Sequence, residues 1–194
     1  MKALMTATLT LLLAGLVHAD DDVIGIYFDK DASQVELKTE VVQQQVAAYL
    51  IAVSTSAQDA IAGWEASLRV ESDGLMAQSW SYAGSDLDAD ADDYQIELAA
   101  GAALPWSQAV ILATWSGMVL GTQDRVAFFV GAREGSSALP DAPGYVVESA
   151  QAEVHELHVA GDAASGLVAL INADEGESVA VPSTTLSRLK TLYR

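Results

Sequence analysis

The sequence predicts an all-β chain: an antiparallel β-sandwich of about ten strands. Apolar and polar residues alternate with a period of two in most segments after residue 20, the pattern of half-buried strands. Clusters of Asp, Gly, Ser and Pro separate these segments at intervals of about 8–12 residues, which is typical of sandwiches rather than βαβ units. With 194 residues, 51% of them hydrophobic, the chain suffices for one domain with a sizeable core.

Residues 1–19 match a cleavable secretory signal peptide. Lys2 supplies the positive charge, residues 3–17 are uncharged and largely apolar, and Val17 and Ala19 are the small residues before the expected cleavage point. The apolar stretch is shorter than the ~20 residues that a membrane-spanning helix needs. We therefore expect a signal helix that is removed on export to the periplasm, cell surface or exterior. No membrane insertion is expected after cleavage.

The domain proper is expected at residues 20–172, and its first strands follow the signal closely. The segment 41–46 is the one place in this half where a helix is an alternative. The expected strands are residues 23–28, 35–38, 47–53, 61–70 and 75–82. Within residues 61–70, Trp64, Ala66 and Leu68 share one face and predict a core-facing strand.

The second half continues the pattern around two loops, an acidic one at residues 84–93 and a Gly/Ser/Pro-rich one at residues 134–144. The expected strands are residues 94–98, 109–119, 125–131, 146–148, 153–159 and 167–171. Residues 173–194 form an acidic linker and a short basic C-terminal helix or tail, in which Leu186 and Leu189 share a helical stripe after the N-cap candidate Ser183.

Charge limits the partners. The chain carries 27 acidic against 9 basic residues, a net charge of −18, and it has no cysteine. Such a surface repels phosphate backbones and anionic lipids, which argues against nucleic-acid binding and peripheral membrane binding. Cations, basic proteins and neutral polymers remain as partners. The absence of cysteine excludes disulfides and a lipid-modified N-terminal cysteine.

Several segments support a resemblance. The order VIGIYFD, AAYLIAV, IAGWEASLRV and VILATWSGMV, with the ending SRLKTLYR, resembles a group of exported bacterial β-sandwich proteins of uncharacterised function. Residues 47–171 are more remotely similar to cohesin-type and carbohydrate-binding-module sandwiches, which also carry I-x-G-W/F and LATW-type strands. The resemblance implies a jelly-roll-like, cohesin-like sandwich with a binding or scaffolding role, and it transfers no catalytic or binding residue.

The acidic loop is a candidate calcium site, because alternate carboxylates on a tight loop can converge on a hard cation. The candidate ligands are Asp86, Asp88, Asp90, Asp92 and Glu97. Counted from Asp86, they occupy EF-hand positions 1, 3, 5, 7 and 12, yet Ala91 replaces the required Gly and the flanks are strands. A looser calcium-holding loop and a solvated acidic loop are the two interpretations that remain.

Aromatic residues are candidate ligand contacts, because exposed rings can stack on sugars. Trp80 and Tyr82 lie two residues apart on one strand face, and Trp106 follows a proline in a loop. These three are the candidate ligand-binding residues, whereas Trp64 and Trp115 are expected in the core.

No catalytic constellation emerges. His155 and His158, three residues apart on one strand, would point to opposite faces and could not chelate a metal together. Glu65 beside Trp64 is the best candidate for a glycosidase-type carboxylate pair. The leading prediction is a non-catalytic exported binding or scaffolding module for a glycan or protein. The alternatives are a structural surface component with a calcium-holding loop and a hydrolase with an unrecognised carboxylate pair.

Overall fold

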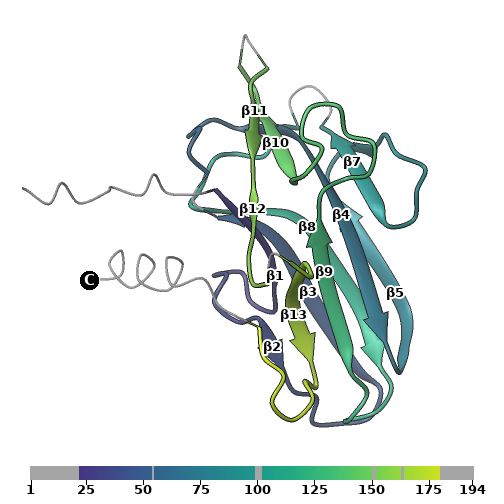
Figure 1. Cartoon of the computed structure of the whole chain (residues 1–194). Helices are drawn as coiled ribbons and strands as arrows, with labels where there is room; N and C mark the ends of the chain where they lie inside the picture. The colour runs from purple at the N-terminus through teal and green to yellow at the C-terminus, as the bar shows by residue number, and fades with distance from the viewer. Residues whose placement is uncertain (1–21, 54, 99–101, 150–151, 163, 180–194) are drawn as a thin grey trace, which may run out of the picture.

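The computed structural model describes residues 22–53, 55–98, 102–149, 152–162 and 164–179 (Figure 1). Within these ranges the chain has thirteen strands and no helix, so the prediction of an all-β chain is confirmed. The expected signal helix and the expected C-terminal helix lie outside the described residues. No helix in the described ranges is long and apolar enough to cross a membrane.

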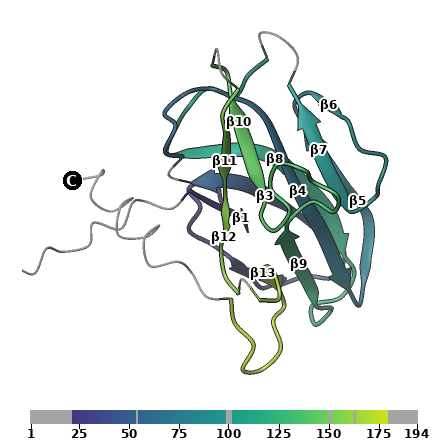
Figure 2. The ribbon, with the colours of Figure 1, turned by 45° about the horizontal axis from the view of Figure 1, so that its top comes forward.

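Two sheets form the sandwich (Figures 1 and 2). The five-stranded sheet has the order β12 (His158–Val159), β1 (Val23–Tyr27), β3 (Gln44–Val53), β8 (Ala109–Val119) and β5 (Leu75–Tyr82). The eight-stranded sheet runs β11 (Val154–Glu156), β10 (Gly144–Val147), β4 (Ile61–Ser72), β9 (Val126–Gly131), β13 (Leu167–Ile171) and β2 (Glu36–Leu37). On the other edge of β4 lie β7 (Asp93–Glu97) and then β6 (Ser85–Asp86).

Both sheets are mixed, which differs from the antiparallel prediction. β1 pairs with β12 in parallel, and β13 pairs with β2 in parallel. The first of these pairs exists because residues 153–159, expected as one strand, change sheets: Leu157 turns into the core at 1% exposure and separates β11 from β12. Figure 2 shows the two short strands following each other along the front of the molecule. The segment 41–46, the helix alternative, instead supplies the start of β3.

The core lies between the inner faces of the two sheets. Trp64, Ala66 and Leu68 alternate inward from β4 and are at most 3% exposed, as predicted. Trp115 on β8 is fully buried and meets Phe128 of the opposite sheet edge-to-face, with 4.9 Å between ring centroids, a favourable geometry for aromatic pairs. Both tryptophans expected in the core therefore lie there.

A buried carboxylate joins the start of β1 to β10. Asp22 is 6% exposed. It accepts hydrogen bonds from the Ser56 amide at 2.6 Å, the Ser56 hydroxyl at 2.9 Å and the Tyr145 hydroxyl at 2.6 Å. Its own carbonyl accepts from the His158 amide at 2.7 Å. Because a buried charge is costly unless it is hydrogen-bonded, these donors make Asp22 a fixed point of the fold.

Charge is distributed unequally between the sheets. No residue in the five strands of the five-stranded sheet is Asp, Glu, Lys or Arg. The outer face of β3, β8 and β5 consists of cross-strand rows of small or neutral residues, such as Ala47, Ser116 and Ser79. All charged residues that lie on described strands belong to the eight-stranded sheet. Charged recognition by strand residues is therefore confined to that sheet.

Candidate functional site

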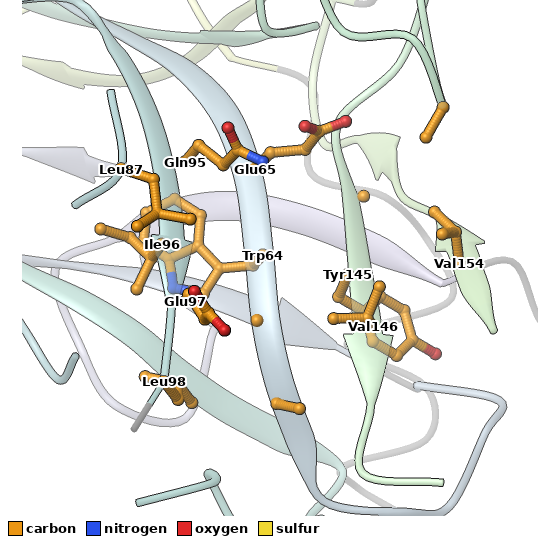
Figure 3. Close-up of a pocket in the computed structure, with 14 residues that line it drawn as sticks. Trp64, Glu65, Leu87, Gln95, Ile96, Glu97, Leu98, Tyr145, Val146 and Val154 are labelled. Carbon is orange, nitrogen blue, oxygen red and sulfur yellow. The ribbon is translucent and has the colours of Figure 1, made fainter. Parts of the chain in front are cut away.

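The candidate site is a groove of about 420 Å³ on the outer face of the eight-stranded sheet, over β7, β4, β10 and β11 (Figure 3). Side chains alternate between the two faces of a strand. Trp64 on β4, Ile96 on β7 and Tyr145 on β10 point into the core. The residues next to each of them along its strand therefore face outward. The groove therefore lies on the opposite side of the sheet from the core.

Strand register places the outward residues in two rows. Directly opposite residues form the first row, Gln95, Glu65 and Gly144, and the second row, Glu97, Gly63, Val146 and Val154. Neighbouring side chains in such rows have Cβ atoms about 4.5–5.5 Å apart, and diagonal neighbours such as Glu65 and Glu97 are about 7–8 Å apart. Two strands from the first half of the chain and the hairpin of β10 and β11 thus contribute to one surface.

Each of these rows contains a glycine, Gly144 in the first and Gly63 in the second. Neither Gly63 nor Gly144 has a positive φ, so neither is required for backbone conformation. A Cβ on Gly63 would lie 2.9 Å from the carbonyl oxygen of Ile96, and one on Gly144 would overlap Cδ1 of Leu139. Glycine within a strand marks a place where another group approaches closely. The missing side chain of Gly63 leaves room over the second row, whereas the Leu139 side chain occupies the place over Gly144.

The loop of residues 132–143 forms one rim. β9 ends at Gly131 opposite Ser67, and β10 begins at Gly144 opposite Glu65. The loop therefore leaves and rejoins the same edge of β4 within two residues. Its Ser136 hydroxyl donates to Oε1 of Glu65 at 2.6 Å and accepts from the amide of Leu139 at 3.1 Å. These bonds hold Ala138 at the groove, among its lining residues.

An ion pair joins this loop to the acidic loop on the opposite rim. Nε of Arg133 donates to Oδ2 of Asp88 at 2.6 Å, and the Glu134 amide donates to Asp93 at 3.3 Å. The Asp90 amide first, and the Arg133 guanidinium second, lower the pKa of Asp88 below its ordinary value. Asp88 in turn raises the pKa of Arg133. The two loops are therefore tied across β4 and β7.

The groove is lined by both apolar and acidic side chains. Leu87 and Val154 are large apolar side chains that are 55% and 42% exposed. Its polar side chains are Glu65, Gln95 and Glu97. Those of Gln95 and Glu97 form no hydrogen bond or ion pair with any described residue. No lining residue is Lys, Arg or His. Arg133 of the adjoining loop pairs with Asp88 and also interacts electrostatically with Glu65.

The predicted calcium ligands are spread along the chain rather than gathered. The Asp88 amide donates to Asp86 at 3.1 Å, and the Asp90 amide donates to Asp88 at 3.0 Å. Glu97 lies on β7 and faces the groove, while Asp92 lies before that strand. In the described part of the chain, no three Asp, Glu or His side chains form a group that could hold a metal ion.

Two of the predicted aromatic contacts lie together. Trp80 and Tyr82 share the inward face of β5, as their spacing predicts, and both are half-buried. Each packs against Tyr94 of β7, with ring centroids 6.4 and 6.1 Å away. The three rings close the open side of the sandwich between β5 and β7.

The third predicted aromatic contact lies elsewhere. Trp106 is 40% exposed, and its indole donates to the carbonyl of Thr55 at 3.1 Å. It precedes β8, whereas Trp80 pairs with Trp115 near the middle of that strand. At ~3.3 Å per residue, about 20 Å of strand separates these positions. Trp106 is therefore not part of the Trp80–Tyr82 surface.

The two candidate histidines belong to different sheets. His155 lies on β11 and stacks on Tyr145 of β10, with 5.0 Å between centroids and 19° between planes. His158 lies on β12 and pairs with Val23. The stacked His155 ring covers the inner side of β10, whose outward residues line the groove.

Sequence reasoning singled out Glu65 and Glu97 separately but missed the groove that joins them. The available signal was Gly63, because it interrupts a strand that is otherwise suited to large side chains. No known family model, curated protein or solved structure matches this chain. The geometry of the site is therefore the basis for its functional interpretation.

Proposed function

We propose that this protein is a non-catalytic, exported β-sandwich binding module that holds a segment of a partner protein in the groove over β7, β4, β10 and β11. The groove itself is the observation that carries the proposal. Its volume of about 420 Å³ falls within the range of about 300–1,000 Å³ common for ligand sites, which are mostly apolar with a few placed polar groups. Leu87, Val146 and Val154 supply the apolar part.

A protein segment suits the groove better than a glycan does. The aromatic residues among its lining, Trp64 and Tyr145, are 3% and 1% exposed and pack in the core, so neither ring offers a face for sugar stacking. Exposed aliphatic side chains beside unpartnered polar groups match the side chains of a peptide. The glycan interpretation depends instead on Trp80, Tyr82 and Trp106, which do not form one surface.

Export is part of the proposal and is supported by the signal-peptide pattern of residues 1–19. The acidic composition is compatible with a role at or beyond the cell envelope, because a high negative charge keeps a protein soluble and reduces its binding to anionic surfaces. A jelly-roll-like, cohesin-like arrangement is the finer form of the fold that the strand sequences suggest. A sandwich with a binding role and no catalytic set agrees with that resemblance.

A hydrolase is the second candidate, because Glu65 and Glu97 line the same groove. Diagonal strand positions separate their Cβ atoms by about 7–8 Å, and glycosidases place two carboxyl groups at comparable separations. The acid of such a pair needs an apolar pocket that keeps it protonated. Glu65 is only half-buried and accepts a hydrogen bond from the Ser136 hydroxyl, and Glu97 is exposed, so neither carboxyl group lies in such a pocket. These surroundings favour binding over catalysis.

The test is an array of peptides and glycans probed with the mature protein, with the variant Val154→Trp and with Met76→Trp as control. Val154 lies at the groove, whereas Met76 is 55% exposed on the other sheet. We expect peptide binding that Val154→Trp reduces at least tenfold and Met76→Trp leaves unchanged. Peptide binding that Val154→Trp does not affect would refute the site. Turnover of chromogenic substrates that Glu65→Gln abolishes would establish the hydrolase.

A further inference from the structure

We infer that the groove selects a lysine or arginine side chain from the bound protein segment; this inference rests on the proposed function and names its specificity. The groove combines two carboxylates with aliphatic walls. A basic side chain has the matching parts, since it carries a charged head on an apolar stem. The recognised feature is thus one basic residue within an extended segment.

Charge complementarity is the first argument. Glu65 and Glu97 both line the groove, and none of its lining residues is basic. Glu97 has no hydrogen-bond or ion-pair partner among the described residues, so it is available to a ligand. A guanidinium or ammonium group that lay between these two diagonal carboxylates could donate a charge-assisted hydrogen bond to each of them. The net charge of −18 also attracts a basic segment over longer distances.

The glycine positions give the second argument. Gly63 lies directly opposite Glu97 on one side and Val146 on the other. A ligand side chain that lay over Gly63 would therefore have a carboxylate on one side and an aliphatic wall on the other. Val154 extends that wall on β11. The methylene stem of a lysine or arginine side chain would therefore lie over Gly63, with the charged end of that side chain toward Glu97.

The neighbouring arginine does not already occupy this place. Arg133 lies on the loop beside the groove, but its guanidinium is bound to Asp88. Glu65 uses one oxygen, Oε1, to accept the Ser136 hydroxyl at 2.6 Å, and that bond positions the carboxylate without neutralising it. Arg133 also interacts electrostatically with Glu65, so Glu97, which has no ion-pair partner among the described residues, is the carboxylate more available to a ligand.

The experiment measures fluorescence anisotropy of labelled pentapeptides Thr-Thr-Xaa-Thr-Thr with the full mature protein at low ionic strength. Xaa is lysine, arginine, norleucine or citrulline, so stem length is kept while charge is removed. The protein variants are Glu97→Gln, Glu65→Gln, the groove-filling Val154→Trp and the matched control Glu40→Gln, an exposed acid outside the groove. Melting curves establish that each variant is folded.

We expect lysine and arginine peptides to bind about tenfold more tightly than norleucine and citrulline peptides. Loss of one exposed ionic contact is worth up to about 1 kcal/mol, so Glu97→Gln and Glu65→Gln should each reduce that preference about threefold to fivefold. Val154→Trp should weaken binding of every peptide, and Glu40→Gln should retain both affinity and preference. If norleucine binds as tightly as lysine and Val154→Trp still blocks both, the groove binds peptides but the charge inference is wrong. If Val154→Trp changes nothing for any peptide, the proposed function itself fails.

Discussion

The hydroxyl of Tyr145 donates a 2.6 Å hydrogen bond to Oδ2 of Asp22, across 123 residues of sequence. Asp22 precedes β1 and Tyr145 lies on β10, so the bond joins the start of one sheet to the strand that carries part of the groove. Gly144 and Val146, on either side of Tyr145, face the groove. The position of this groove wall therefore depends on a contact made beneath it, in the core.

Removing that hydroxyl should destabilise the protein. In Tyr145→Phe the buried carboxylate keeps only its Ser56 donors, and hydrogen bonds to charged groups contribute about 1.5–3 kcal/mol. We expect the free energy of unfolding, measured by urea denaturation, to fall by about that amount. Tyr49→Phe is the control, because Tyr49 is half-buried on the outer face of β3 and its hydroxyl has no hydrogen bond to a described residue. Equal effects of the two changes would contradict the role of Asp22.

The raised pKa of Tyr145 predicts that the protein loses stability at alkaline pH. Burial, and then the hydrogen bond to Asp22, raise the pKa of Tyr145 to about 12. Because the folded pKa lies above the unfolded value of about 10, the stabilisation is present below about pH 10 and is lost as pH rises to 12. Denaturation midpoints from pH 9 to 12 should fall more steeply in the wild type than in Tyr145→Phe. Parallel profiles would count against this assignment.

The ion pair between the two loops predicts an acid titration. Asp88 has a lowered pKa, caused first by the Asp90 amide and then by Arg133. In Arg133→Gln the Asp88 pKa should rise yet stay below its ordinary value, because the amide bond remains. In the wild type, the ionised Asp88 stabilises the fold above the unfolded pKa of about 3.9. This stabilisation is lost as pH falls through the folded pKa of Asp88. Carboxyl-carbon NMR titration measures this, and an unchanged midpoint in Arg133→Gln would refute the pairing.

Calcium addition tests the other interpretation of the acidic loop. Arg133 occupies Asp88, so we expect millimolar Ca²⁺ to leave the melting temperature of the wild type unchanged. A calcium-holding loop would instead raise the melting temperature, because a ligand that binds only the folded state stabilises it by mass action. If Ca²⁺ raises the melting temperature of the wild type and Asp86→Asn abolishes that rise, the loop binds calcium. The expectation drawn from the ion pair between Arg133 and Asp88 would then be wrong.

Gly63 of the groove and Gly131 at the end of β9 should respond in opposite ways to the same substitution, glycine to alanine. Gly63→Ala places a Cβ 2.9 Å from the Ile96 carbonyl oxygen, and relieving such overpacking costs about 1–3 kcal/mol. Gly131→Ala on β9 meets nothing within 4 Å and has no positive φ. It should therefore stabilise the chain by up to about 1 kcal/mol through the unfolded state. Urea midpoints of the two variants should move in opposite directions, and a shared direction would contradict the packing argument.

Much of the fold was predictable because alternation and turn residues are local signals. The bounds of β5, β8 and β13 agree with the expected segments, and the burial of Trp64 and Trp115 follows from their neighbours in sequence. The change of sheet at Leu157 was not predictable, since residues 153–159 look like one strand. Nor were the parallel pairs of β1 with β12 and β13 with β2, because pairing partners are set by non-local packing.

The site was less predictable than the fold for the same reason. Glu65 and Glu97 lie on strands that pair only in the folded protein, and Val146 and Val154 come from a distant hairpin. No local pattern indicates that these residues face outward together. The spacing of the acids in residues 84–93 predicts a candidate cation site. It does not predict that Arg133 of another loop binds Asp88.

A methyl-resolved NMR titration of residues 20–194 with the tightest peptide from the array locates peptide binding on the molecule. We expect saturable shifts at the methyl groups of Leu87, Val146 and Val154, with no change at Met76 or Met118 on the uncharged face of the five-stranded sheet. Shifts confined to those two methionines would place binding on the other sheet and refute the groove as the binding site.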